Sequence, residues 1–319
     1  MAKILITDGL AADGVSILKS EKSFELDVRK ETPVAELMNI IENYDCLVVR
    51  SATKVTKEVI EKAKNLKLIC RAGAGVDNVD VEAASARKIA VMNTASANSL
   101  AAAELTIGLM FAMLRQVPQA QQSMREQRWD RATFSGFEVT GKTLGVLGLG
   151  NIGKIVADRA VGLKMNVIGY DPHVTQSTQL PAELRNTVKI ETSIDAVLKA
   201  ADIITLHLPL NKETKGMMNR DRLSLMKDGA WLLNCARGGV VDEDALCDLL
   251  DAGKLRGAAF DVFKEEPVKF PNRLAAHPKA IVTPHLGAST TEAQLRVGLN
   301  AAQQIVGYFT KGDRTGVLN

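Results

Sequence analysis

The stretch TLGVLGLGNIGKIVADRA, residues 143–160, decides the fold. It begins with an apolar, strand-like run, continues through Gly148, Gly150 and Gly153 in the spacing GxGxxG, and ends in a helical pattern. In such a strand–turn–helix the first glycine makes the tight turn and the second lets a pyrophosphate approach the backbone. The third lets the helix pack closely on the strand, and the N-terminus of the helix faces the phosphates. The stretch therefore predicts a dinucleotide site at the start of a parallel α/β sheet.

Asp171 follows the next strand-like run, MNVIGY, and lies 18 residues after Gly153. An acidic residue near this offset binds the ribose hydroxyls of NAD. Pro172 and His173 come next, so no arginine stands there to accept the 2′-phosphate of NADP. Because GxGxxG alone also occurs in purely structural turns, the prediction depends on the strand, the helix and the acid around it. Together they predict NAD as the cofactor.

Strand-like apolar runs alternate with helical patterns along the whole chain. Before residue 98 the runs are KILIT, FELDV, DCLVV, LKLIC and IAVMN, and after the glycine turn they are MNVIGY, DIITLHL, AWLLNCA, GAAFDVF and AIVTPH. Because parallel strands need crossover helices between them, this alternation indicates an α/β fold. We predict two Rossmann-like, doubly wound parallel-sheet domains joined by an apolar helix at residues 98–116. The helical segment 289–312 could cross back onto the first domain, which would make that domain discontinuous.

The composition is that of a globular protein of about two domains: 319 residues, 46% hydrophobic and 24% charged. The net charge is +3, and no basic block interleaved with aromatics occurs, so we expect no nucleic-acid partner. No apolar run reaches about eighteen residues, and MAKILITDGL lacks the features of a signal peptide. We therefore expect no membrane span and a cytoplasmic location. Cys46, Cys70, Cys235 and Cys247 have no metal-type spacing, which predicts buried reduced thiols and no metal site.

The chain has four histidines, and imidazole is the side chain that titrates near neutral pH without perturbation. His173 follows the predicted ribose acid, away from the nicotinamide, and His277 lies in a loop before a strand. His207 ends a strand, but no acid with an orienting role follows it. His285, in TPHLGAST at the end of a strand-like run, is the histidine that we predict to transfer a proton.

Three polar residues follow successive strand-like runs of the second domain: Arg237, Glu266 and His285. Ligands of open α/β sheets bind at the carboxyl ends of the strands. Beside a nicotinamide, Arg237 would bind a substrate carboxylate and polarise the neighbouring carbonyl. His285 would pass the proton that accompanies hydride transfer, and Glu266 would hold the imidazole and favour its charged form. Each residue alone also fits a salt bridge, a turn or a loop. Their order after GxGxxG predicts a dehydrogenase of hydroxy or oxo acids.

The chain resembles the D-isomer-specific 2-hydroxyacid dehydrogenases over essentially its whole length. The matching stretches are VRSATKVT (49–56), RAGAGVDNVD (71–80), NSLAAAELTIGLM (98–110), GKTLGVLGLGNIG (141–153), NCARGGVVDE (234–243), AAFDVFKEEP (258–267) and PHLGAST (284–290). The resemblance implies an NAD-binding cleft between two Rossmann-like domains, of which the first is flavodoxin-like. It implies a substrate-binding domain at 1–97, an NAD-binding Rossmann domain at 98–285 and a C-terminal helix at 286–319 that returns to the first domain. It also implies a short form without the regulatory domain that longer members carry.

The resemblance assigns roles to three sets of residues. The catalytic set is Arg237, Glu266 and His285. The cofactor set is Gly148, Gly150, Asn151, Ile152, Gly153, Asp171, Leu208, Cys235, Ala236, Arg237, Asp261, His285, Gly287 and Ala288. The substrate set is Arg50, Ser51, Arg71, Gly73, Ala74, Gly75 and Arg131. At Ala74 and Leu208 many related members have threonine, so we expect only backbone contacts there.

A phosphorylated substrate needs a second anion site besides the one for its carboxylate. Arg50 and Arg71 follow strand-like runs of the first domain and could supply it, although surface charge explains each of them equally well. Arg131 resembles a basic residue that family members present to the active site of a neighbouring subunit. The resemblance therefore implies a homodimer or homotetramer, with the helix at 98–116 in the interface.

The function that the resemblance implies is the NAD-dependent oxidation of 3-phospho-D-glycerate to 3-phosphohydroxypyruvate, the first step of L-serine biosynthesis. A glyoxylate or hydroxypyruvate reductase, or another D-2-hydroxyacid dehydrogenase, is the alternative within the same class. An NADH-sensing, corepressor-like binding protein is the alternative in a different class. Such corepressors typically carry terminal extensions with partner-binding motifs, which the 319 residues do not contain.

Overall fold

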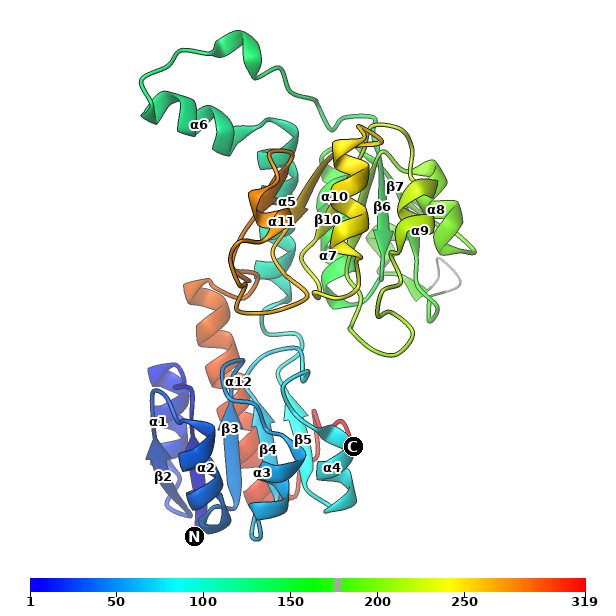
Figure 1. The fold of residues 1–319 in the computed structure, drawn as a ribbon. Helices are drawn as coiled ribbons and strands as arrows, with labels where there is room; N and C mark the ends of the chain where they lie inside the picture. Colours follow the sequence, from blue (N-terminus) through cyan, green and yellow to red (C-terminus); the bar gives the residue numbers. More distant parts are fainter. Residues whose placement is uncertain (175–178) are drawn as a thin grey trace. The chain divides into compact units, whose positions relative to one another are not determined.

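The computed structural model describes residues 1–174 and 179–319, which form two compact units (Figure 1). Unit 1 consists of Met1–Ser99 together with Ala288–Asn319, and unit 2 consists of Leu100–Gly287. Each unit is built on its own parallel sheet. The roles of the predicted domains, 1–97, 98–285 and 286–319, stay predictions.

The sheet of unit 1 has the strand order β2-β1-β3-β4-β5, counted over residues 1–99 and 288–319. Its strands are β1 (Ala2–Ile6), β2 (Phe24–Val28), β3 (Cys46–Val49), β4 (Leu68–Arg71) and β5 (Ala90–Asn93). All of their pairings are parallel. The order 2-1-3-4-5 is that of flavodoxin-like sheets. The predicted flavodoxin-like N-terminal domain is therefore confirmed.

Successive residues of β1 pack on opposite faces of this sheet. Ile4 and Ile6 pack with α1 (Ala12–Ser20) and α12 (Thr291–Lys311). Leu5 packs on the other face with α2 (Val34–Ile40), η1 (Ile41–Asn43), α3 (Lys57–Lys62) and α4 (Val81–Ala86). Because side chains alternate along a strand, a strand covered on both faces must be apolar at consecutive positions. The run KILIT meets this requirement.

The helix α12 completes unit 1 from the far end of the chain and lies against α1 (Figure 1). Two glycines allow this contact: a Cβ on Gly14 would lie 2.5 Å from the carbonyl oxygen of Gly298. A separation this short is not reached by real Cβ atoms, so the helices approach only because both positions lack a side chain. The predicted discontinuous first domain is confirmed.

Over the described residues, the sheet of unit 2 has the strand order β12-β11-β10-β9-β6-β7-β8, and all of its pairings are parallel. Its strands are β6 (Thr143–Leu147), β7 (Asn166–Tyr170), β8 (Val188–Ile190), β9 (Ile203–Leu206), β10 (Ala230–Asn234), β11 (Leu255–Phe260) and β12 (Ala280–Val282). The direction of winding reverses between β6 and β9, which makes this a Rossmann-like sheet with its switch point beside β6. β8 was not predicted from the sequence, because its three residues include a lysine and show no apolar run.

Helices cover both faces of this second sheet. α5 (Ser99–Leu114) and α7 (Asn151–Gly162) pack on one face. α8 (Ile194–Ala200), α9 (Arg220–Leu225), α10 (Glu243–Asp251) and α11 (Arg273–Ala276) pack on the other. The short helices η2 (Arg131–Thr133) and η4 (Ala182–Leu184) lie in connecting segments. The predicted doubly wound parallel sheet is confirmed.

The helix predicted at 98–116 is observed as α5 and ends at Leu114. Gln116 has φ +52°, a left-handed conformation that ends a right-handed helix, and α6 (Val117–Arg125) begins directly after it. No single helix among the described residues is long and apolar enough to cross a membrane. Within the same residues, only α5 and α6 taken together have the length and apolar composition of a membrane span, and they are bent by 63° relative to each other. The four cysteines, all within the described residues, are free and buried.

We expect Gly14→Ala to lower the free energy of unfolding by about 2 kcal/mol, because the added methyl group forces α1 away from α12. Chemical denaturation of the wild type and the variant measures the difference. Gly162→Ala is the matched control: Gly162 is also helical, and no described residue lies within 4 Å of the Cβ it would gain. A Gly14→Ala loss no larger than that of the control would contradict the close helix contact.

Candidate active site

The glycine turn after β6 tolerates no side chain at two of its three glycines. Gly148 has φ +96°, and a Cβ there would lie 2.4 Å from the carbonyl oxygen of His207. A Cβ on Gly153 would lie 1.9 Å from the carbonyl oxygen of Gly148, so the first turn of α7 closes tightly onto the strand. Within residues 1–174 and 179–319, nothing lies within 4 Å of a Cβ on Gly150, so these residues leave open space in front of the turn. The geometry of the three glycines fits a tight strand-to-helix turn, and their approach to a pyrophosphate stays a prediction.

The N-terminus of α7 presents backbone N–H groups beside this open space. The first N–H groups of a helix have no carbonyl partner within the helix. Among the described residues, no side chain caps this end of α7. Asn151 and Ile152 occupy its first two positions, as predicted for pyrophosphate contacts. A helix end of this kind attracts phosphate through its free donors and its dipole.

Asp171 directly follows β7, the strand next to β6. Its Oδ2 accepts a hydrogen bond from the N–H of Leu149 (2.8 Å), and its Oδ1 accepts one from the N–H of His173 (2.8 Å). The carboxylate is thus fixed against the glycine turn. Because a carboxylate can accept about four hydrogen bonds, it retains capacity for ribose hydroxyls. The turn, the helix end and this acid fit a dinucleotide such as NAD.

Glu266 and His285 are hydrogen-bonded in the structure, with 2.6 Å between Glu266 Oε2 and His285 Nδ1. Because a carboxylate only accepts, Nδ1 carries the proton and Nε2 remains available for proton transfer. The other oxygen of Glu266 accepts from the N–H of Phe263 (2.9 Å), which fixes the carboxylate. The His285 side chain is 45% exposed, so a substrate can reach the ring. The predicted pair is therefore present.

The carboxyl of Glu266 is held in its ionised form. Burial opposes ionisation, but the hydrogen bonds from His285 and from the Phe263 N–H favour it. The nearby positive charge of Arg237 acts in the same direction. The net result is a pKa of Glu266 below its ordinary value. The charges of Arg237 and His285 therefore both act on Glu266. The three residues lie in the segments that follow β10, β11 and β12.

Arg237 is positioned by a buried asparagine that the sequence pattern did not single out. Asn234, the last residue of β10, accepts from the N–H of Ala236 (3.1 Å) and donates to the carbonyl of Arg237 (3.0 Å). Its side chain therefore shapes the turn that contains Cys235, Ala236 and Arg237. Cys235 and Ala236 are buried, and Leu208 follows the neighbouring strand β9 at the same edge of the sheet.

Asp261 fixes the backbone around His285. This fully buried carboxylate accepts from the Thr283 hydroxyl (2.5 Å) and from the N–H groups of Leu286 (2.7 Å) and Gly287 (2.8 Å). His285 itself has φ +56°, which is uncommon for a residue with a side chain. Such a conformation persists only where its surroundings impose it. Thr283 was not predicted, because its hydroxyl has a role only once Asp261 lies beside it. Contact of Asp261 with the carboxamide stays a prediction.

The other histidines are not placed for this chemistry. His173 is exposed, and its N–H donates to Asp171. His277 is buried; its Nδ1 accepts from the Lys279 N–H (3.1 Å), and its Nε2 lies 3.2 Å from Asp251. His207 is the most unusual. Its Nε2 lies 3.0 Å from the Thr205 hydroxyl, and its buried Nδ1 has no hydrogen-bond partner among the described residues. Burial lowers the pKa of His207 to about 3.

In unit 1 the predicted substrate residues come together at the carboxyl ends of two paired strands, β3 and β4. Arg50 follows β3, and its guanidinium donates to the amide oxygen of Gln294. Arg71 ends β4, and its guanidinium lies against Gly73, whose φ of +149° favours glycine. The remaining predicted substrate residues of unit 1 are Ser51, Ala74 and Gly75, in the same two loops. Ala288, from the predicted cofactor set, lies in unit 1 before α12.

Arg131 lies outside these groups. It is exposed in η2, on the segment after α6 that projects from unit 2 (Figure 1). Within unit 2 the structure does not bring it to the glycine turn or to His285. Its predicted contribution to a neighbouring subunit's site stays a prediction.

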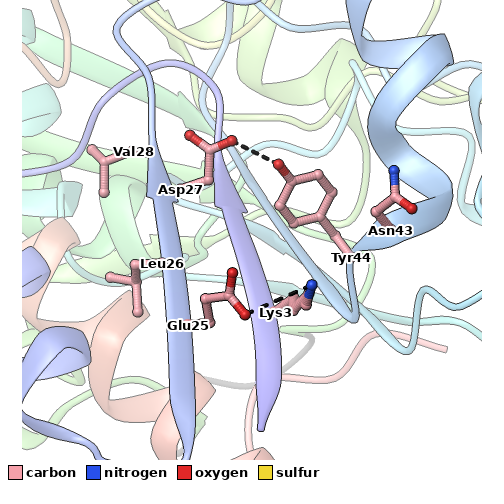
Figure 2. Close-up of a pocket in the computed structure, with 7 residues that line it drawn as sticks. All are labelled: Lys3, Glu25, Leu26, Asp27, Val28, Asn43 and Tyr44. Carbon is pink, nitrogen blue, oxygen red and sulfur yellow. Dashed lines mark hydrogen bonds and ion pairs between the residues drawn. The ribbon is translucent and has the colours of Figure 1, made fainter.

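A hollow on unit 1 lies beside β2 and is not part of the predicted site. Figure 2 shows its lining: Lys3, Glu25, Leu26, Asp27, Val28, Asn43 and Tyr44. Two pairs of its polar groups interact: the Tyr44 hydroxyl donates to Asp27 (2.6 Å), and Lys3 lies 3.7 Å from Glu25. Burial and the hydrogen bond to Asp27 raise the pKa of Tyr44 to about 12. Residues 1–174 and 179–319 contain no cluster of three acidic, histidine or cysteine side chains that could hold a metal.

A family model and named relatives place this chain in the same protein family. Residues 107–287 match the family model described as D-isomer specific 2-hydroxyacid dehydrogenase, NAD binding domain. The D-3-phosphoglycerate dehydrogenase of Methanocaldococcus jannaschii is 49% identical over 307 residues, which are 96% of this chain and 57% of that protein. The chain thus spans little more than half the length of this relative.

Two solved structures are similar over nearly all of both chains. One is an NAD⁺-bound 3-phosphoglycerate dehydrogenase of Entamoeba histolytica, with a TM-score of 0.82 and 29% sequence identity. The match covers 100% of this chain and 98% of the Entamoeba chain. A glyoxylate reductase of Paecilomyes thermophila has a TM-score of 0.87 and 31% identity, and covers 98% of this chain and 97% of its own.

The partly buried His207, whose Nδ1 is shielded from solvent, makes stability depend on pH. Because the unfolded imidazole titrates near 6.5 and the folded one near 3, the unfolded state binds more protons between these values. The resulting loss of folding free energy is negligible well above pH 6.5 and grows as the pH falls below it. At pH 5 it amounts to about 2 kcal/mol, which His207→Gln should remove. Urea unfolding at pH 7 and pH 5 measures it, with His173→Gln as the exposed control. An unchanged pH dependence in His207→Gln would contradict the buried neutral ring.

Proposed function

The chain belongs to the D-isomer specific 2-hydroxyacid dehydrogenases, and residues 107–287 match their NAD-binding domain; from this premise we propose that it oxidises 3-phospho-D-glycerate to 3-phosphohydroxypyruvate. The observation that carries the proposal is the hydrogen-bonded pair of Glu266 and His285 beside Arg237, in the unit that contains the glycine turn. The similarity to a named D-3-phosphoglycerate dehydrogenase supports the substrate. The reaction would be the first step of L-serine biosynthesis.

His285 and Glu266 perform the proton transfer. The glycine turn and Asp171 would hold NAD, which would supply the acceptor for the hydride of C2 of the hydroxy acid. His285 Nε2 takes the proton of the C2 hydroxyl, so the oxygen becomes a carbonyl without passing through a free alkoxide. The imidazolium formed is stabilised by the Glu266 carboxylate at 2.6 Å, which also fixes the ring. In the reverse direction the same pair delivers the proton.

Arg237 binds the substrate carboxylate and polarises the adjacent oxygen. A guanidinium makes two parallel hydrogen bonds to a carboxylate, which fixes the orientation of C2. The turn that carries Arg237 is held by Asn234, so little freedom is lost when the substrate binds. In unit 1, the backbone N–H groups of Gly73–Gly75 would bind the substrate carboxylate. Arg50 and Arg71, with Ser51 in the same loop as Arg50, would bind the phosphate.

We further propose a cytoplasmic homodimer or homotetramer. The segment of α6 and η2 exposes large apolar side chains: Val117 by 53%, Met124 by 54% and Trp129 by 79%. Such side chains gain most from burial against another subunit. Arg131, next to Trp129 in this segment, would then reach the partner's site. The four free, buried cysteines fit a reducing compartment.

The substrate assignment predicts a strong preference for the phosphorylated acid. We expect the kcat/KM of NADH oxidation with phosphohydroxypyruvate to exceed that with glyoxylate by about 100-fold or more, because an empty phosphate site leaves charged groups unpaired. A steady-state panel of phosphohydroxypyruvate, hydroxypyruvate, glyoxylate and pyruvate measures this. Equal or higher values for glyoxylate would favour a glyoxylate reductase, consistent with the similarity to that enzyme.

The role of His285 predicts a loss of rate without loss of cofactor binding. His285→Ala should lower kcat by about 100-fold to 10,000-fold, the range that general acid–base catalysis supplies. The dissociation constant of NADH, followed by fluorescence titration, should change little. His173→Ala, on the exposed side of Asp171, is the control and should keep the wild-type kcat. A normal kcat in His285→Ala would remove this histidine from proton transfer.

A further inference from the structure

The loop Arg50–Thr53, which follows β3, is held by a carboxylate from another strand end. Asp8 Oδ2 accepts from the N–H of Arg50 (2.7 Å) and from the N–H of Thr53 (3.1 Å). Asp8 Oδ1 accepts from the Thr53 hydroxyl (2.5 Å). Asp8 lies 42 residues before Arg50 in the sequence. The Asp8 side chain therefore binds the backbone N–H groups at both ends of this loop.

Asn78 holds the same two ends by their acceptors. Its Nδ2 donates to the carbonyl of Arg50 (2.7 Å) and to the carbonyl of Thr53 (2.7 Å). Asn78 lies in the second predicted substrate loop, which begins after β4 at Gly73. Its own carbonyl accepts from the N–H of Val55 (2.8 Å). Asn78 therefore joins the loop after β3 to the loop after β4.

The two side chains leave the centre of the loop free. Within the described part of the chain, the backbone N–H groups of Ser51 and Ala52 make no hydrogen bond, and both residues are exposed. The N–H groups on either side of them are occupied by Asp8. Successive free N–H groups in a turn form a site for an anion. The carbonyl groups of Arg50 and Thr53 are occupied by Asn78.

We propose that Asp8 and Asn78 are positioning residues that fix the loop Arg50–Thr53 so that the Ser51 and Ala52 N–H groups bind the substrate's phosphate. The inference rests on the proposed function, because it takes a phosphorylated acid as the substrate. Neither residue touches the substrate. They order the loop before the substrate binds, so binding costs less conformational entropy.

The chemistry of the two side chains makes distinct demands. Asp8 must accept at one oxygen from two N–H groups, and an asparagine can do the same with its Oδ1 while its Nδ2 donates to the Thr53 hydroxyl. Asp8→Asn should therefore preserve the loop, whereas Asp8→Ala should not. Asn78 must donate to two carbonyls, and a carboxylate has no donor. Asn78→Asp should therefore behave like Asn78→Ala.

The experiment compares KM values for phosphohydroxypyruvate and unphosphorylated hydroxypyruvate. In Asp8→Ala and Asn78→Ala we expect the KM for the phosphorylated acid to rise about tenfold, as for the loss of one charge-assisted contact. The KM for hydroxypyruvate, the kcat and the NADH dissociation constant should each stay within about twofold. Asp8→Asn should restore the KM to within about threefold of the wild type.

Asp45→Ala is the matched control. Asp45 also holds a backbone N–H by its carboxylate, that of Lys3 (2.9 Å), but it precedes β3 at the opposite edge of the same sheet. It should lower stability without raising the KM for the phosphorylated acid. Hydrogen exchange followed by mass spectrometry gives a readout without substrate: Asp8→Ala should expose the amides of the segment that contains Arg50 and Thr53, and Asp45→Ala should not.

Three results would overturn the proposal: an unchanged KM in both alanine variants, an equal rise for both acids, or the same rise in Asp45→Ala. If Asp8→Ala does not fold, Asn78→Ala with Asn78→Asp carries the comparison. A wild type that shows no preference for the phosphorylated acid would instead refute the proposed function, whatever the variants do. The two failures are thus distinguishable in one set of measurements.

Discussion

A carboxylate placed just after a parallel strand, accepting backbone N–H groups from an adjacent loop, is the interaction on which the candidate site depends. Asp171 holds the glycine turn at Leu149, and Asp261 holds the turn around His285. Asp8 does the same for the loop at Arg50 in the other unit. Loops at the carboxyl ends of strands lie beyond the ladder, so their N–H groups need partners from side chains. Each carboxylate makes the loop rigid and thereby fixes a functional residue.

The architecture was predictable because it follows from local patterns. Apolar runs covered on both faces, helical segments between them and one glycine turn dictate two parallel sheets, and both are present. The pairing of Glu266 with His285 was also predicted, since residues after neighbouring parallel strands must meet at one edge. β8 was not predicted, because a three-residue strand with a lysine has no distinctive period.

The supporting residues could not be found in the same way. Asn234, Thr283 and Asn78 are common polar types in loops, and nothing near them in sequence marks their role. Asn78 meets partners 25 and 28 residues away, and the hydroxyl of Thr283 meets a carboxylate 22 residues away. Such contacts depend on which loops become neighbours and on the register of the strands. Residue type gives the chemistry of a side chain, and only the fold determines its partner.

The presence of α12 in unit 1 has a consequence for synthesis on the ribosome. The face of the first sheet that carries Ile4 and Ile6 is covered in part by a helix translated after the whole of unit 2. At ordinary elongation rates, about 10 to 40 s pass between the translation of β5 and that of α12. Unit 2 is translated during this interval, so all of its strands are present when the first sheet still lacks α12. Unit 2 can therefore complete its sheet before the first sheet is covered by α12.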